Sequence, residues 1–189
     1  MSISRWRRIL RVATTSLVLL TVALQLSPAR AVRCFGRAAS QGTPSDDVIR
    51  GSADADSIAG RQGDDSIGGS GGDDRLCGNR GNDAMFGNQD DDQLGGSPGR
   101  DRLDGGPGQD LLRGRAGRDR LVGRSGDDIM NGGTQDDRLK GGVGADTLRG
   151  GAGADTVDAT DGAAGDIVRG GSGTDSCTVD PGDIVMGCE

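Results

Sequence analysis

The chain has 189 residues, of which 37 are glycine, and it contains no histidine, no tyrosine, two phenylalanines and one tryptophan. This scarcity of aromatic bulk excludes a layered globular core of ordinary design. The formal net charge is −7, which argues against nucleic acid as a partner, because a phosphate backbone is bound by cationic surfaces.

The N-terminus has the pattern of a signal peptide over residues 1–31. Four arginines lie among the first eleven residues, an apolar stretch runs from Val12 to Leu26, and Ala29 and Ala31 occupy the small-residue positions of a cleavage site. The apolar stretch is shorter than the ~20 residues that span a bilayer, although a retained membrane anchor is the alternative. We expect a secreted protein without a membrane span in its mature form. The Sec and twin-arginine routes both stay open.

Removal of that segment makes the chain more acidic. It carries five arginines and no acid, so 22 − 5 = 17 basic residues remain against 29 acidic ones, a net charge of −12. Of these acids only Glu189 is glutamate. The bias towards aspartate favours short carboxylates close to the backbone, as turns and metal sites use them.

An internal repeat dominates the mature chain. Residues 42–158 divide into thirteen units of nine residues without a gap. Counted from Gly42, position one is always glycine, position eight is always aliphatic or methionine, and position four is glycine in nine units. The register then slips by two residues, and two further units lie within residues 159–178. Position six is aspartate throughout: Asp47, Asp56, Asp65, Asp74, Asp83, Asp92, Asp101, Asp110, Asp119, Asp128, Asp137, Asp146, Asp155, Asp166 and Asp175.

Each repeated position has a physical meaning. Glycines permit positive φ, so the first six residues can form a turn in which backbone carbonyls converge. An aspartate at its end adds a carboxylate, and such oxygen ligands suit Ca²⁺. The last three residues predict a short strand that buries its middle residue. Two units then form one coil, and stacked coils form two parallel sheets around a thin core. Like charges would stack as well, so we expect folding to require several Ca²⁺ ions held by the fifteen aspartates.

The units resemble the repeats-in-toxin family, also called hemolysin-type calcium-binding repeats, with the consensus G-G-x-G-x-D-x-U-x, where U is a large apolar residue. The units GGVGADTLR and GGAGADTVD fit the whole consensus. The resemblance implies an all-β, right-handed parallel β-roll, with Ca²⁺ between units n and n+2 and up to eleven complete sites in phase. It also implies lower local occupancy at substitutions such as Gln135. The signal peptide and the cysteines make the chain similar to small stand-alone secreted members of that family.

Four cysteines lie in the mature chain: Cys34, Cys77, Cys177 and Cys188. An even count behind a signal peptide predicts two disulfides. Three pairings are possible, and proximity in sequence favours Cys34–Cys77 and Cys177–Cys188. These bonds would close an N-terminal cap at residues 32–41 and a C-terminal cap at residues 179–189. A zinc site is disfavoured, because there is no CxxC spacing and no histidine.

These patterns predict a structural or binding module and not an enzyme. The alternatives are a calcium-dependent secreted hydrolase, which would rely on pairs such as Asp64-Asp65, and an adhesin fragment. A disordered Gly/Asp tract explains the composition but not the strict phase, and is what we expect of the calcium-free chain. An ice-binding solenoid is disfavoured because position seven is irregular. No pattern identifies a protein or cell-surface partner.

Overall fold

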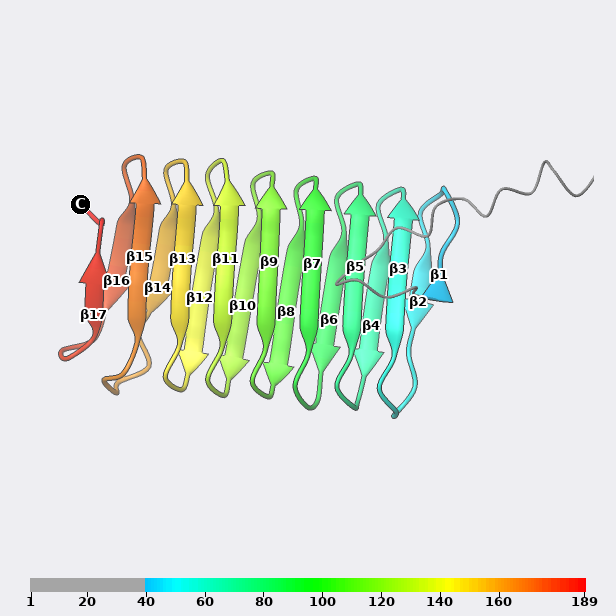
Figure 1. Cartoon of the computed structure of the whole chain (residues 1–189), viewed down its shortest axis with the longest axis horizontal. Coiled ribbons are helices and arrows are strands. Elements are labelled where there is room, and N and C mark those ends of the chain that lie inside the picture. Colours follow the sequence, from blue (N-terminus) through cyan, green and yellow to red (C-terminus); the bar gives the residue numbers. More distant parts are fainter. Residues whose placement is uncertain (1–39) are drawn as a thin grey trace, which may run out of the picture. The chain divides into compact units, whose positions relative to one another are not determined.

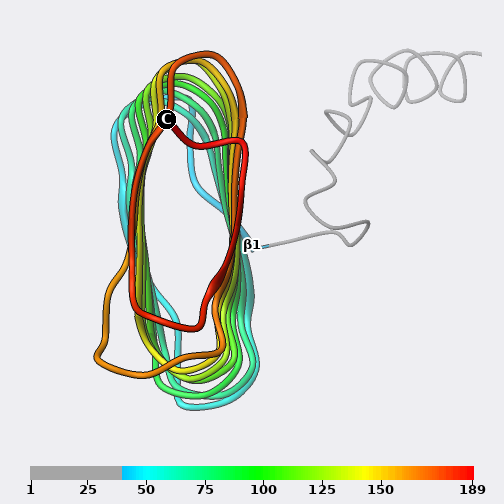
Figure 2. The same ribbon diagram turned by 90° about the vertical axis from the view of Figure 1, so that its left-hand side faces the viewer.

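The computed structural model describes residues 40–189, which fold as a stack of flattened coils (Figures 1 and 2). Within this part of the chain there are seventeen strands and no helix. Odd-numbered strands form a nine-stranded sheet: β1 Ser40–Gln41, β3 Ser57–Gln62, β5 Arg75–Arg80, β7 Gln93–Pro98, β9 Leu111–Ala116, β11 Ile129–Thr134, β13 Thr147–Ala152, β15 Ile167–Ser172 and β17 Ile184–Met186. Even-numbered strands form an eight-stranded sheet: β2 Val48–Arg50, β4 Ser66–Ser70, β6 Ala84–Asn88, β8 Arg102–Pro107, β10 Arg120–Ser125, β12 Arg138–Val143, β14 Thr156–Ala159 and β16 Ser176–Val179.

Successive strands alternate between the two sheets, so two nine-residue units complete one coil. Each strand pairs in parallel with the strand two places on. Leu111, for example, pairs with Ile129, which pairs with Thr147. The offset of 18 residues is twice the repeat length. This arrangement confirms the predicted all-β parallel β-roll.

The core is a single layer of side chains between the sheets. Position eight of nearly every unit is buried, from Ile58 and Ile67 to Leu148 and Val157, with Val168 continuing the row. Ile49, in the first unit, is only partly buried. Because side chains in a strand alternate between faces, positions seven and nine point outwards on either side of each core residue.

The strands are longer than the three residues predicted. In most units they run from position seven through position three of the next unit, as in Leu111–Ala116, and only positions four to six form the turn. The register of paired Cα atoms skips position one, since Arg113 pairs with Asn131 and Arg115 with Gly133, but Gly114 has no partner. The regular pairing is therefore interrupted at the position-one glycine within one continuous strand.

The two-residue slip is absorbed in one turn. Across it the pairing offset is 20 residues, with Thr147 opposite Ile167 and Thr156 opposite Ser176. The wider orange loop in Figure 2 contains these extra residues. Both sheets continue beyond it, so the last two units stay part of the same roll.

A disulfide closes the C-terminal end. Cys177 bonds to Cys188, and both pack against the end of the core together with Val179. This bond was predicted. Cys77 is also disulfide-bonded. Its predicted partner Cys34 lies outside the described residues, as do the predicted signal peptide and most of the N-terminal cap.

Candidate calcium sites

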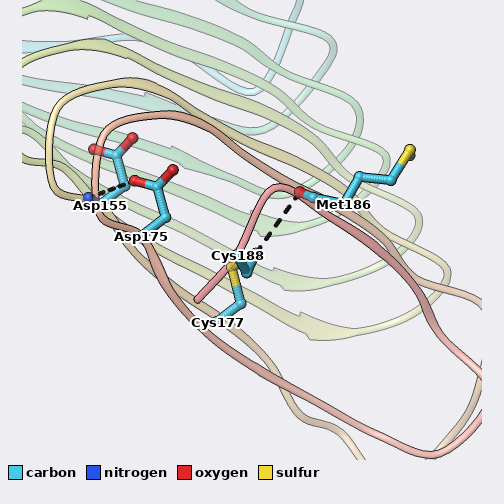
Figure 3. The surroundings of a disulfide bond; sticks show 5 residues. All are labelled: Asp155, Asp175, Cys177, Met186 and Cys188. Atoms are coloured by element: carbon cyan, nitrogen blue, oxygen red, sulfur yellow. Dashed lines mark hydrogen bonds between the residues drawn. A yellow bond between two sulfur atoms is a disulfide. The ribbon is translucent and has the colours of Figure 1, made fainter.

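The position-six aspartates form two hydrogen-bonded ladders, one along each edge of the roll. The backbone N–H of each of the thirteen aspartates from Asp47 to Asp155 donates to Oδ1 of the aspartate two units on, at 2.7–2.9 Å. Figure 3 shows the bond from Asp155 to Asp175 near the C-terminal disulfide, at 2.9 Å. The ladders run without interruption from Asp47 to Asp175, across the register slip. The structure therefore brings together all fifteen predicted ligands, in pairs two units apart.

The second carboxylate oxygen has no partner in thirteen of the fifteen aspartates. From Asp65 to Asp175 every position-six Oδ2 is buried and accepts no hydrogen bond. The residues themselves are at most 2% exposed. Buried polar atoms normally have a partner, because an unsatisfied one costs roughly 1–3 kcal/mol. A row of such atoms indicates that a positively charged group belongs beside them.

The position-one glycines let two oxygens approach the backbone where a side chain would not fit. A Cβ on Gly114 would lie 2.3 Å from Oδ2 of Asp119 and 2.6 Å from the carbonyl oxygen of Gly132, in the next coil of the same sheet. Hence a carboxylate oxygen of one unit and a carbonyl oxygen two units on approach the same point. Oxygens of these two kinds are the ligands that Ca²⁺ prefers.

Burial makes these carboxylates difficult to ionise. It raises the pKa of Asp83, Asp110, Asp119 and Asp146 to about 6. It raises the pKa of Asp92, Asp101 and Asp137 to about 7 and that of Asp128 to about 8. The N–H bond to Oδ1 opposes the rise, and in most cases neighbouring carboxylates add to it. Burial likewise raises the pKa of Asp65, Asp74, Asp155 and Asp166.

The two N-terminal aspartates differ from the rest. Oδ2 of Asp47 accepts from the backbone N–H and the hydroxyl of Thr43, at 2.6 and 3.0 Å. Oδ2 of Asp56 is held in the same way by Ser52, at 2.6 and 2.9 Å. In these two units the position-two residue thus satisfies the oxygen that is unpaired elsewhere, whereas Ser70 and Ser97 at the same position leave Oδ2 of Asp74 and Asp101 unpaired. As predicted ligands, these two are the least suited of the fifteen.

One residue in the tail takes a place that the repeat pattern did not assign. Oδ1 of Asp183 accepts from the N–H groups of Gly165 and Asp166, at 3.0 and 3.1 Å, and Oδ2 accepts from Asp180. Burial opposes ionisation, but these three bonds together lower the pKa of Asp183. Asp183 therefore ends one ladder with both oxygens satisfied. The sequence signal was the short Gly182-Asp183-Ile184 echo of the repeat.

Residues at position five form a further ladder, which the sequence did not predict. The N–H of Asp64 donates to Oδ1 of Asp46 at 2.8 Å, and that of Asn82 donates to Oδ1 of Asp64 at 2.7 Å. Equivalent bonds join Arg100 to Asn82 and Gln109 to Asp91. These position-five groups are exposed. In an adjacent Asp pair, the first aspartate therefore belongs to this exposed ladder and the second to the buried position-six ladder. Asp64-Asp65, considered for a hydrolase, is used in this way.

The substitution Gln135 does not interrupt the buried ladder. Gln135 takes the left-handed backbone conformation, with φ of 78°, that glycine adopts at this position elsewhere. In the same unit, Asp137 still accepts from Asp119 at 2.8 Å and keeps an unpaired Oδ2. The lower occupancy that the resemblance implied at Gln135 stays a prediction.

The site cannot be built from side chains alone. Nowhere in residues 40–189 do three or more Asp, Glu, His or Cys side chains converge to hold a metal ion. Any ion at the buried ladders would therefore need backbone carbonyls as well as Oδ2 atoms. Such a mixed oxygen set suits Ca²⁺ and does not suit zinc or other nitrogen- and sulfur-seeking metals.

Two further features of the described residues concern other functions. A hollow of about 580 Å³ beside β2, β4 and β6 includes Phe86, Asn88 and Arg50 in its lining but no carboxylate. No helix in this part of the chain is long and apolar enough to cross a membrane.

Comparison with known proteins agrees with this geometry. A family model for the RTX calcium-binding nonapeptide repeat, four copies long, matches residues 41–76, 68–103, 95–130, 104–139, 131–164 and 140–177. Comparison with curated proteins and with solved structures gives no significant match. The matches together span residues 41–177, the same part of the chain that forms the coils and both aspartate ladders. The chain therefore belongs to the RTX calcium-binding nonapeptide-repeat family, as a β-roll built almost wholly of those repeats.

Proposed function

We propose that this protein is a secreted structural or binding module that becomes a rigid rod when it binds several Ca²⁺ ions between successive coils. The observation that carries the proposal is the row of thirteen buried Oδ2 atoms without hydrogen-bond donors. Each would contribute one ligand, and position-one carbonyl oxygens would contribute others. When bound, calcium would supply the positive charge that these carboxylates lack.

Calcium would control whether the roll folds at all. The core is one side chain thick, and burial of the ionised carboxylates opposes folding at neutral pH. Ion binding offsets that cost and so is coupled to folding. An unfolded chain would suit export, and calcium outside the cell would then fold it. The predicted signal peptide and the Cys177–Cys188 bond support this setting.

The rod would act through its surfaces and not through catalysis. In the described residues most acidic side chains belong to the two kinds of ladder, and the hollow beside β2, β4 and β6 has no carboxylate in its lining. No observation favours the hydrolase, and the expectation that the chain is not an enzyme remains a prediction.

Circular dichroism of Val32–Glu189, which forms one compact unit, tests the proposal. The β signal should be absent with a chelator at neutral pH, should appear as millimolar Ca²⁺ is added, and should disappear on chelation. Magnesium is the matched control and should not substitute, because it demands a smaller, more regular octahedral shell. A β signal that chelation leaves unchanged would overturn the proposal.

A further inference from the structure

Charge is segregated between the edges and the faces of the roll. The strands of the nine-stranded sheet contain no acidic residue, although the chain as a whole has 29 acids and a net charge of −7. The same strands contain seven arginines: Arg61, Arg75, Arg80, Arg113, Arg115, Arg149 and Arg169. This sheet is therefore a cationic surface on an acidic protein.

The C-terminal half of this surface also presents aliphatic side chains. At position seven, Leu111 of β9, Ile129 of β11, Thr147 of β13, Ile167 of β15 and Ile184 of β17 are register partners in a row. Ile129 is 55% exposed and Ile184 is 56% exposed. Strands lie ~4.8 Å apart, so the row is roughly 19 Å long. We call the outer side of β9, β11, β13, β15 and β17 the amphipathic face.

A basic row runs beside the aliphatic one. Position nine of the same strands holds Arg113, Asn131, Arg149 and Arg169, again as register partners. Residues two apart in a strand point to the same side, ~7 Å from each other. The amphipathic face thus has an aliphatic stripe and an arginine stripe that follow the axis of the roll together.

The arginines of the amphipathic face lie beside one another without a carboxylate in the same strands. Arg149 and Arg169 are direct neighbours on adjacent strands, where like charges destabilise a sheet. The eight-stranded sheet also has arginine neighbours, Arg102, Arg120 and Arg138. It differs in that its strands contain carboxylates: Asp104 bonds to Arg124 through both oxygens, and Asp158 bonds to Lys140 at 3.1 Å. No carboxylate stands in the strands of the amphipathic face.

We infer that the amphipathic face binds the surface of a lipid bilayer that contains anionic phospholipids. The arginine stripe would contact lipid phosphates, and the aliphatic stripe would enter the boundary between headgroups and acyl chains, as peripheral membrane-binding surfaces do. A second copy of the chain is a poorer occupant, because apposed copies of this face would bring arginine against arginine. The inference goes beyond calcium binding and gives the folded rod a place to act.

Vesicle sedimentation tests this inference with Val32–Glu189 in millimolar Ca²⁺. The protein should bind vesicles of equal parts phosphatidylcholine and phosphatidylglycerol, and should not bind phosphatidylcholine alone. Because calcium could itself bridge the acidic turns to lipid, binding by the unchanged protein is not sufficient. The double variant Arg149→Gln/Arg169→Gln should bind the anionic vesicles roughly thirty-fold more weakly, since each cation at such a surface contributes about a factor of five.

The matched control is Arg120→Gln/Arg138→Gln. These arginines are also register partners, but on the eight-stranded sheet, and their replacement changes the net charge equally. Vesicle binding should be unchanged. An equal loss in both double variants would overturn the inference, because it would show non-specific attraction to the protein's cations.

A second pair of variants tests the aliphatic stripe without changing charge. Ile129→Ser should weaken vesicle binding several-fold, whereas Val143→Ser, which alters a side chain 64% exposed on β12, should not. Failure of the unchanged protein to bind anionic vesicles, or binding to dextran sulfate without binding to vesicles, would overturn the inference. Circular dichroism in calcium shows for every variant that the roll is folded, so these results are independent of the calcium proposal.

Discussion

The backbone N–H of Asp101 donates to Oδ1 of Asp119 at 2.8 Å, while Oδ2 of Asp119 stays buried without a donor. One oxygen of the same carboxylate thus joins two coils of the roll, and the other is left for a cation. The same two roles of Oδ1 and Oδ2 recur along both edges of the roll.

Replacement of Asp119 by asparagine should separate these two tasks. The amide oxygen can still accept from Asp101, so the coil contact survives, but the buried charge is lost. In the calcium-free protein at neutral pH, we expect the free energy of unfolding to rise by roughly 1–3 kcal/mol, since the pKa of Asp119 is raised to about 6. Calorimetric titration should show fewer bound Ca²⁺ ions. Asp47→Asn is the control, because Thr43 already satisfies its Oδ2. Equal calcium stoichiometry in the unchanged protein and Asp119→Asn would contradict the assignment.

The calcium-free roll should lose stability as pH rises. Burial raises the pKa of Asp101 to about 7 and that of Asp128 to about 8, against 3.8 for an ordinary aspartate. The folded state holds protons that the unfolded chain releases. The stability that these protonated aspartates contribute is complete below pH 3.8 and is lost as pH rises through 6–8. Calcium affinity should rise over the same range, because ions and protons compete. Thermal melts with chelator and calcium titrations at several pH values measure both trends. A calcium-free melting temperature that increases with pH would contradict this account.

A methyl group at position one should damage the site. In Gly114→Ala the new Cβ would lie 2.3 Å from Oδ2 of Asp119 and 2.6 Å from the carbonyl oxygen of Gly132, so both must move. We expect a loss of about 2 kcal/mol or more in calcium, by analogy with overpacked cores. In Gly68→Ala the nearest atom is 3.9 Å away, and the change should be neutral or slightly stabilising. Chemical denaturation in calcium compares the free energies of unfolding of the two variants. Equal values would contradict the close approach of the two oxygens at Gly114.

Glycine at position two should stabilise the roll. Arg115 has a φ of 85°, a conformation that costs a non-glycine residue roughly 1 kcal/mol or more. Arg115→Gly should therefore raise stability by about 1 kcal/mol in calcium. Arg138, at position seven of β12, does not have this conformation, and Arg138→Gly should lower stability by roughly 0.5–1 kcal/mol. Denaturation midpoints that shift in the same direction for both variants would argue against a conformational origin.

The C-terminal disulfide should protect the last coil from fraying. Cys177 and Cys188 enclose a short loop, and loss of such a bond removes about 2–3 kcal/mol. In the double variant Cys177→Ser/Cys188→Ser, amide hydrogens of Ile184–Met186 should exchange faster, while those of Leu111–Ala116 in the middle of the roll should not change. Hydrogen exchange measured by mass spectrometry resolves these segments. Uniform acceleration along the roll would instead indicate that the bond stabilises the whole fold.

The sequence by itself determined the periodic features of this protein. A period of nine residues with one inward apolar side chain permits two strands per coil. The thirteen units between Gly42 and Asp158 therefore predicted the two parallel sheets, with the position-six aspartates at the ends of the turns. Proximity in sequence favoured the Cys177–Cys188 bond among three possible pairings, and the structure confirms that bond. These features depend only on the types of residue and on their spacing along the chain.

Only the tertiary structure decided which oxygens are free and which faces are exposed. The 18-residue offset places Asp101 against Asp119, leaves one carboxylate oxygen unpaired and aligns Ile129 with Leu111. The 20-residue offset across the register slip aligns Arg149 with Arg169. The folded turn of the first unit brings the Thr43 hydroxyl to Asp47, and the pairing of the tail with the last coil brings Asp183 into the ladder. The physical reason is that hydrogen-bond satisfaction and burial are properties of stacked coils. A nine-residue unit read alone contains the aspartate, but not the neighbour that binds one of its oxygens and buries the other.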